Sequence, residues 1–302
     1  MVWLLARVYV RDRADLPAAR IYQNRLDVRP LSRLNETSFQ SSYPRALPTA
    51  IERRTMIDAL RKMGSTAFFE RFMQLAAVNP PDPANAQFTQ TVLVPLGLAS
   101  AASSPASSIA ASQRALLASG YDRVLARLGA PGAVQQRSRT ANGWNLPGQA
   151  PPGSFGTNYL VRAIVAIWEL AENPSADTIY FNASTDRNGA RLDGSRRYSL
   201  TFAAGNTPPA RAFWSVTVYD DRGRLITNPS GRYAVSSGEN LVRKPDGALL
   251  ISLQPDDPGP VQHSNWLPTS PGHTYELSLR CYWPDVALLD GRWTPPPVMP
   301  ID

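Results

Sequence analysis

The spacing of hydrophobic positions along the chain changes from helical to strand-like near Pro174. Upstream, apolar residues recur every three or four positions, which predicts helices over residues 49–78, 114–129 and 157–173. Gly64 predicts a break within the first of these segments. The last segment is apolar nearly all the way round, which is typical of a buried helix.

Downstream of Pro174, short alternating or aromatic runs are separated by turn residues. The runs are DTIYFNA, RYSLTF, AFWSVTVYD, GRYAVS, LVRK, ALLISLQ and TYELSLRCYW. Pairs such as Asn188-Gly189 and Asp246-Gly247 between them suit hairpin loops. Consecutive strands without crossover helices predict an antiparallel β-sandwich of jelly-roll type. The predicted fold class is therefore α+β, with a helical N-terminal segment followed by this sandwich.

The first residues of the chain also have the composition of a strand. Residues 2–10, VWLLARVYV, are β-branched and aromatic, and a helix is predicted after them over residues 18–26. No strand precedes this one, so its edges need a strand far downstream, another chain or a segment outside this sequence. Pairing with a partner chain or a second copy through residues 2–10 is therefore an open alternative.

Charge and composition exclude several classes of protein. The net charge of the 302 residues is +7, carried almost wholly by arginines scattered among the acids, which excludes the clustered cations of a nucleic-acid-binding protein. No stretch approaches the roughly 18 uninterrupted apolar residues of a membrane span. The N-terminal apolar run lacks the cleavage site of a signal peptide, and the compartment stays open. Cys281 is the single cysteine and is expected to be packed within its strand.

Several motifs in the strand-rich part agree in order and spacing with a known family. They are LDGSRRYSLTF, PPARAFWSVTVYD, NPSGRYAVSS, DGALLISLQ, NWLP, LRCYWP and LDGRWTPPPV. With these motifs the chain resembles bacterial proteins that carry a DUF1254 domain followed by a DUF1214 domain. The DUF1214 resemblance covers roughly residues 155–302, and MVWLLARVYVRDRADLPAARIYQNRLDVRPLS resembles the closing segment of DUF1254.

This resemblance implies a division of the chain into three parts. Residues 1–48 would be the remnant of a DUF1254-like β domain, residues 49–150 a helical linker domain, and residues 151–302 a DUF1214-like helix with its jelly roll. The jelly roll is similar to the sandwich of peptide N-glycanase-type amidohydrolases. The family has no settled reaction and no established catalytic residues to transfer, and its members are often exported.

Carboxylates are the best candidates for catalytic chemistry, because a sandwich can present an acid and a base from adjacent strand ends. The predicted catalytic residues are Asp186, Asp193 and Asp220. The alternative is that each is a turn residue bound to its own backbone. No nucleophile-elbow motif exists, and His263 and His273 alone do not make a metal site, so neither a metal nor a cofactor is expected.

Aromatic, arginine and amide side chains are the candidates for ligand binding. Alternation along a strand sends one of two consecutive aromatic residues to each face, so some must point away from the core. Asn265 falls in a long irregular segment, where binding groups are common. The predicted substrate-binding residues are Trp214, Arg232, Asn265, Trp266, Arg280 and Trp283. Packing between domains and structural ion pairs are the alternative roles.

Two functions follow from these candidates. The first is a hydrolase that acts on a glycan, an amide or a related polar small molecule at a carboxylate-lined aromatic site. The second is a non-catalytic ligand-binding or structural β-sandwich module that pairs with a missing domain or partner chain. In either case a small molecule or carbohydrate is the expected ligand, and nucleic acid and a membrane span are not expected.

Overall fold

A computed structural model of the chain describes residues 6, 8, 10, 14–27, 29, 31–33, 35–36, 53–98, 109–130, 139–147, 155–168, 172–221 and 223–301. The chain forms two compact units, Met1–Ile51 and Glu52–Asp302, which are described separately. Most of the strand predicted over residues 2–10 lies outside the described residues. The pairing predicted for it stays a prediction.

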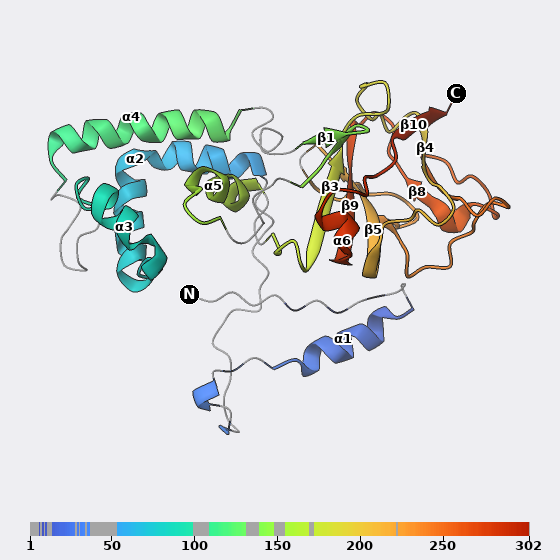
Figure 1. The fold of residues 1–302 in the computed structure, drawn as a ribbon, viewed down its shortest axis with the longest axis horizontal. Helices are drawn as coiled ribbons and strands as arrows, with labels where there is room; N and C mark the ends of the chain where they lie inside the picture. The colour runs from blue at the N-terminus through green and yellow to red at the C-terminus, as the bar shows by residue number, and fades with distance from the viewer. Residues whose placement is uncertain are drawn as a thin grey trace. The chain divides into compact units, whose positions relative to one another are not determined.

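The first unit contains helix α1 (Leu16–Arg25) and a short 3₁₀ helix, η1 (Leu31–Arg33) (Figure 1). Pro17 suits the first turn of α1, because a proline there sacrifices no intrahelical hydrogen bond. Only Ala19 of this helix is buried, while Ile21 and Tyr22 are exposed. The helix predicted at this point is therefore present, but its apolar residues are not covered by the unit that contains them.

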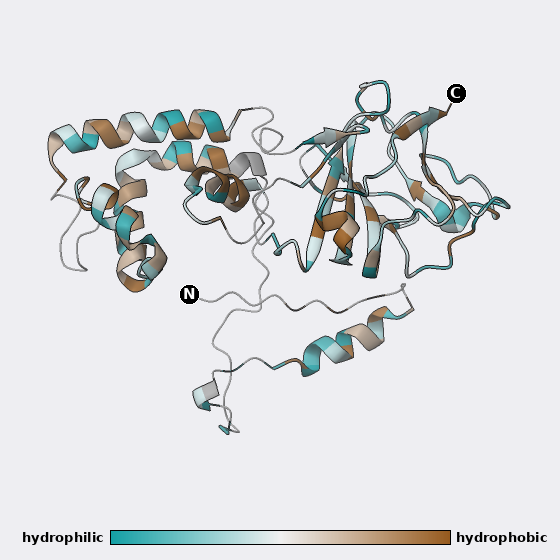
Figure 2. Cartoon of the chain, in the orientation of Figure 1, coloured by the Kyte–Doolittle hydropathy of each residue, from teal (hydrophilic) through white to brown (hydrophobic). Residues whose placement is uncertain are grey.

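The second unit begins with the helices, which build small cores of their own. They are α2 (Arg53–Val78), η2 (Pro83–Asn85), α3 (Ala86–Phe88), η3 (Thr89–Leu93), α4 (Ala111–Leu128) and α5 (Tyr159–Trp168). Helix α2 packs against α4 and α5. Figure 2 shows their apolar residues as brown bands, and the buried ones include Ile57, Tyr121, Leu125 and Ile164. None of the described helices is long and apolar enough to cross a membrane.

Gly64 breaks α2 in the middle, as the sequence predicts. Its backbone angles are φ 75° and ψ 164°, a conformation that is strained for any residue with a Cβ. The Tyr121 hydroxyl donates a hydrogen bond of 2.5 Å to the carbonyl of Leu60, one turn before the break. The second half of α2 therefore starts afresh at Ser65, with α4 held beside it.

Two sheets form the strand-rich part of this unit. The six-stranded sheet has the order β1 (Thr140–Ala141), β2 (Trp144–Asn145), β3 (Thr178–Ala183), β9 (Tyr275–Pro284), β5 (Ala210–Asp220) and β6 (Ala234–Ser236). The four-stranded sheet has the order β10 (Val298–Ile301), β4 (Arg197–Phe202), β7 (Leu249–Gln254) and β8 (Trp266–Pro268). A short helix, α6 (Val286–Leu289), follows β9, and the 3₁₀ helix η6 (His263–Asn265) precedes β8.

Alternation along β9 divides its side chains between the core and the outward face of its sheet. Leu277, Leu279 and Cys281 have no exposed surface and belong to the core that both sheets enclose. Arg280 and Tyr282 have the opposite parity and are half-buried on the outward face. The predicted α+β fold with a sandwich is confirmed.

Two details of the predicted sandwich are wrong. The LVRK run, residues 241–244, forms no strand, because its backbone is bound by a side chain from elsewhere in the fold. In addition, β7 and β8 pair in parallel, with Ser252 opposite Trp266. The long irregular connection between them, with η6 at its end, returns the chain to the same end of the sheet, which a hairpin cannot do.

Candidate functional site

Each of the three predicted catalytic aspartates borders a turn and accepts hydrogen bonds from it. The Oδ1 atom of Asp186 accepts backbone N–H bonds from Asn188 (2.8 Å) and Ala190 (3.0 Å), and the residue is 2% exposed. Such bonds close the connection after β3 and leave a carboxylate fixed by its own loop. The position of Asp186 therefore supports the turn alternative more than the catalytic one.

Asp193 and Asp220 are bound in the same way. Asp193 accepts the N–H of Ser195 at 2.8 Å. Asp220 accepts both the N–H of Arg224 at 2.8 Å and its guanidinium Nε at 2.9 Å. No carboxylate of the three is presented without a local partner, so the geometry does not favour an acid and base pair among them. Their catalytic role remains a prediction.

Asp186 and Asp193 nevertheless lie near one buried phenol. Tyr275 has no exposed surface, and its hydroxyl has no hydrogen-bond partner among the described residues. Burial, followed by Tyr198 and the charges of Asp193 and Asp186, raises the pKa of Tyr275 well above its ordinary value. This phenol is therefore neutral. It belongs to the core of the sandwich, where its ring packs edge-on against Tyr198.

Two of the predicted binding tryptophans belong to the interior. Trp214 on β5 is 4% exposed and packs against Phe202 with 5.4 Å between ring centroids. Trp266 on β8 is 8% exposed, and its Nε1 donates to the carbonyl of Gln254 at 2.8 Å. Neither indole offers a free face of the kind that stacks on a sugar ring.

Arg232 is held by a dense set of acceptors. Its guanidinium donates to Glu239 (2.5 Å) and to the backbone carbonyls of His263 (2.8 Å) and Ser264 (2.6 Å). Burial raises the pKa of Glu239, while the charge of Arg232 and hydrogen bonds from Ser236 and Arg232 oppose that rise. Through these bonds Arg232 joins the segment around β6 to η6, and they give no evidence of a ligand contact.

Asn265 has a similar positioning role. It is completely buried, and its Nδ2 donates to the carbonyls of Val242 (2.7 Å) and Leu250 (2.8 Å) while its Oδ1 accepts the Val242 N–H at 2.9 Å. The amide thus supplies the N–H and the carbonyl of Val242 with the hydrogen bonds that a neighbouring strand would provide. Its predicted contact with a ligand has no support in this geometry.

Beside this segment, one of the two histidines forms a pair with an aspartate. His263 Nδ1 lies 2.7 Å from the carboxylate of Asp257, and both side chains are largely exposed. The N–H of Gly259 and His263 lower the pKa of Asp257. No third metal-binding side chain joins this pair in the part of the chain that the structure describes.

Arg280 differs from the other predicted binding residues because its guanidinium is bound only by two hydroxyl groups among the described residues. It lies on the outward face of the six-stranded sheet, in register with Tyr180 on β3 and Ser215 on β5. Its Nη1 donates to the Thr217 hydroxyl (3.2 Å) and its Nη2 to the Tyr219 hydroxyl (3.0 Å). Among the described residues, no carboxylate pairs with it. The structural ion pair that was the alternative role for Arg280 is therefore absent from this part of the chain.

Aromatic rings surround the Arg280 guanidinium. Its central carbon lies 5.3 Å from the ring centroid of Tyr219 and 6.0 Å from that of Tyr180. On the same face, Phe213 and Tyr282 stack with 4.2 Å between their centroids. We call this set of residues the Arg280 face: Tyr180, Phe213, Thr217, Tyr219, Arg280 and Tyr282. Only Arg280 of the set was predicted as a site residue, although strand alternation on a known register would have found the others.

Trp283 departs from this arrangement. Its φ is +52°, which is unusual for a bulky residue, and its side chain is 60% exposed. The N–H of Trp283 donates to the carbonyl of Asp177 at 2.8 Å. This bond joins the end of β9 to the residue before β3. The role of the exposed Trp283 indole in binding stays a prediction.

Fold and site together define an α+β protein with a β-sandwich that carries a cationic aromatic face. Residues 177–286 match the family model described as "Protein of unknown function (DUF1214)", which confirms the predicted DUF1214 domain over that range. The DUF1254 and peptide N-glycanase resemblances stay predictions. No curated protein matches the chain.

A solved structure has a similar fold. The VPA0106 protein from Vibrio parahaemolyticus is similar with a TM-score of 0.65 and 19% identity, over 96% of this chain and 66% of that one. A putative uncharacterized protein from Burkholderia cenocepacia matches 82% of this chain and 52% of that one at 18% identity. Its TM-score of 0.33 supports no structural argument. The chain thus spans 66% of VPA0106, and at this identity the likeness shows the fold alone.

Proposed function

We propose that the sandwich is a ligand-binding module that takes the carboxylate of a small molecule on the Arg280 face. One observation carries the proposal: a half-buried guanidinium stands on a sheet face with no acid paired to it among the described residues. A fully buried charge normally has a counter-charge, and a partly buried one gains from having one. An anionic ligand would supply the one that the described part of the chain does not.

The bonding of Arg280 leaves room for such a ligand. A guanidinium has five N–H donors, and two of them make the hydrogen bonds to Thr217 and Tyr219. The remaining donors suit the planar, bidentate geometry of a carboxylate. Contacts with two tyrosine rings hold the guanidinium in place. Because the side chain is already ordered, binding a ligand costs less conformational entropy.

The rest of the face favours a ligand with an apolar part. The stacked rings of Phe213 and Tyr282 lie one alternate position along the sheet from Arg280. They would cover the hydrocarbon or aromatic part of a ligand whose carboxylate is held by the guanidinium. Small apolar carboxylates are therefore the ligand class that this face fits best.

The hydrolase alternative has less support. It needs a carboxylic acid and a carboxylate free to reach the substrate. Asp186, Asp193 and Asp220 each accept hydrogen bonds from their own turns, as described above. We therefore place the binding module first and retain hydrolysis of a glycan or amide as the second hypothesis.

A thermal unfolding scan tests the binding proposal. We expect benzoate to raise the Tm of the full chain, and benzamide and a neutral oligosaccharide to leave it unchanged. A ligand at 100 times its Kd stabilises the folded state by about 2.7 kcal/mol. The Arg280→Gln variant should lose this shift, whereas Arg211→Gln, which removes an exposed arginine of the neighbouring strand β5, should keep it. An equal benzoate shift in wild type and Arg280→Gln, or none in wild type, would refute the proposal.

A further inference from the structure

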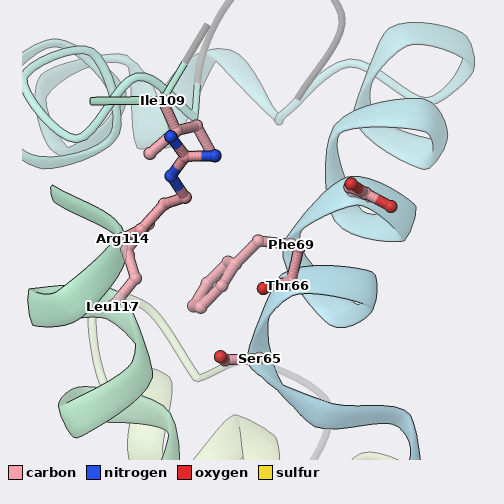
Figure 3. A pocket seen from close by; sticks show the side chains of 7 residues that line it. Ser65, Thr66, Phe69, Ile109, Arg114 and Leu117 are labelled. Atoms are coloured by element: carbon pink, nitrogen blue, oxygen red, sulfur yellow. The ribbon is translucent and has the colours of Figure 1, made fainter. Parts of the chain in front are cut away.

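A pocket lies in the helical part of the chain, away from the strands that carry the Arg280 face. Its volume is about 220 Å³, and it lies between the second half of α2 and α4. The residues that line it are Ser65, Thr66, Phe69, Glu70, Ile109, Arg114 and Leu117. Figure 3 shows the α2 residues facing Ile109, Arg114 and Leu117 across the hollow. The proposed function makes no use of this pocket.

The pocket is lined by one positive side chain, one negative side chain and several apolar ones. Arg114 is contributed by α4 and Glu70 by α2. Neither has an ion-pair or hydrogen-bond partner among the described residues, so the two charges face one pocket without neutralising each other. Ile109 and Leu117 are buried in the apolar cluster below.

From these features we infer that the pocket binds a small zwitterion of the amino-acid class with an aliphatic side chain. The ligand carboxylate would lie against Arg114, its ammonium against Glu70, and its side chain against Phe69, Ile109 and Leu117. A guanidinium offers a carboxylate two parallel donors, and a carboxylate accepts readily from an ammonium. Each end of the ligand would then pair with a charge of opposite sign. Arg114 and Glu70 would in turn gain the partners that they lack among the described residues.

The backbone at Gly64 adds to the preference for a carboxylate. Because φ 75° at Gly64 ends the first half of α2, Ser65 and Thr66 occupy the first turn of a new helical segment. Such a turn has N–H groups without acceptors one turn upstream and carries the positive end of the helix dipole. Ser65 and Thr66 also line the pocket, and their hydroxyl groups can donate hydrogen bonds to an anion.

The size of the pocket sets the size of the ligand. A space of 220 Å³ is several times the roughly 30 Å³ that one water molecule takes in the liquid. A single amino acid such as valine or leucine can therefore enter it. The chemistry of the walls and the volume therefore agree on one ligand class.

Calorimetric titration of the full chain with L-leucine tests this inference. We expect saturable binding, and much weaker binding of 4-methylpentanoate, which is leucine without the ammonium, and of isopentylamine, which is leucine without the carboxylate. Arg114→Gln and Glu70→Gln should each weaken leucine binding by about tenfold or more, as expected for the loss of a charged hydrogen bond. Arg123→Gln, an exposed arginine of α4 outside the pocket, is the matched control and should bind as wild type does.

The possible outcomes separate cleanly. Far-UV circular dichroism of each variant must match wild type, which is expected because Glu70 and Arg114 are exposed. Equal binding of 4-methylpentanoate and leucine would overturn the zwitterion in favour of a plain anion site. Absence of leucine binding to folded wild type, or binding that both substitutions leave unchanged, would overturn the pocket as a ligand site.

Discussion

The side chain of Cys281 shows how strongly the sandwich core controls single residues. It lies on the inward face of β9 with no exposed surface, and burial raises the pKa of its thiol to about 12. The thiolate is the reactive form, so at pH 8 the folded chain should hold this thiol unreactive. The sequence prediction of a packed cysteine agrees with this position.

We predict that a thiol reagent such as Ellman's reagent will label Cys281 at the rate at which the sandwich opens, and rapidly in urea. Because the chain has one cysteine, the absorbance change reports this site alone. Raising the pH from 7 to 9 stays below the raised pKa and should leave the folded thiol protonated. Fast stoichiometric labelling of the native chain would contradict the burial that the structure assigns to β9.

At the scale of elements, strands whose apolar and polar residues alternate could be predicted from the sequence. Segments whose backbone is bound by a distant side chain could not. β3, β4, β5, β7 and β9 follow their period-two patterns. Residues 241–244 are also predicted as a strand, yet they join neither sheet, and the backbone of Val242 is bound by the Asn265 side chain. The Arg280 face likewise depends on the register between β3, β9 and β5, which no spacing within one strand contains.

The role of Asn265 leads to a stability prediction for these elements. Asn265→Ala removes the partners of the Val242 N–H and of the Val242 and Leu250 carbonyls at a completely buried position. We expect a loss of roughly 2–4 kcal/mol in the free energy of unfolding, since buried groups left unpaired cost about 1–3 kcal/mol each and part of that cost can relax. Urea unfolding of this variant measures the loss.

An exposed asparagine provides the control for that experiment. Asn206 lies in a turn, and Asn206→Ala should change the free energy of unfolding by less than about 0.5 kcal/mol. If the two alanine variants were equally stable, the hydrogen bonds of Asn265 would not be what positions residues 241–244. A lower midpoint with an unchanged m-value would show that the folded state alone has lost stability.

At the scale of the whole molecule, the apolar clusters are unequal. The sandwich cluster includes completely buried residues of both sheets, such as Leu200, Val216 and Leu277. The helical clusters are smaller and are built around Ile57, Tyr121 and Met73. No buried residue belongs to both kinds of cluster. Regions with fewer buried apolar contacts open at lower free energy.

We therefore predict that the helices unfold before the sandwich. In a urea titration, the circular dichroism at 222 nm should fall at lower urea than most of the tryptophan fluorescence. Trp144, Trp214, Trp266 and Trp293 are buried in the sandwich, whereas Trp168 packs in a helical cluster and should report the first transition. Leucine, if it occupies the pocket between α2 and α4, should move the first transition alone, and benzoate the second. Coincident transitions by both probes would mean that the two parts unfold as one cooperative unit. A leucine-induced shift of the fluorescence transition would then follow from that cooperativity, whereas separate transitions make each ligand report on its own site.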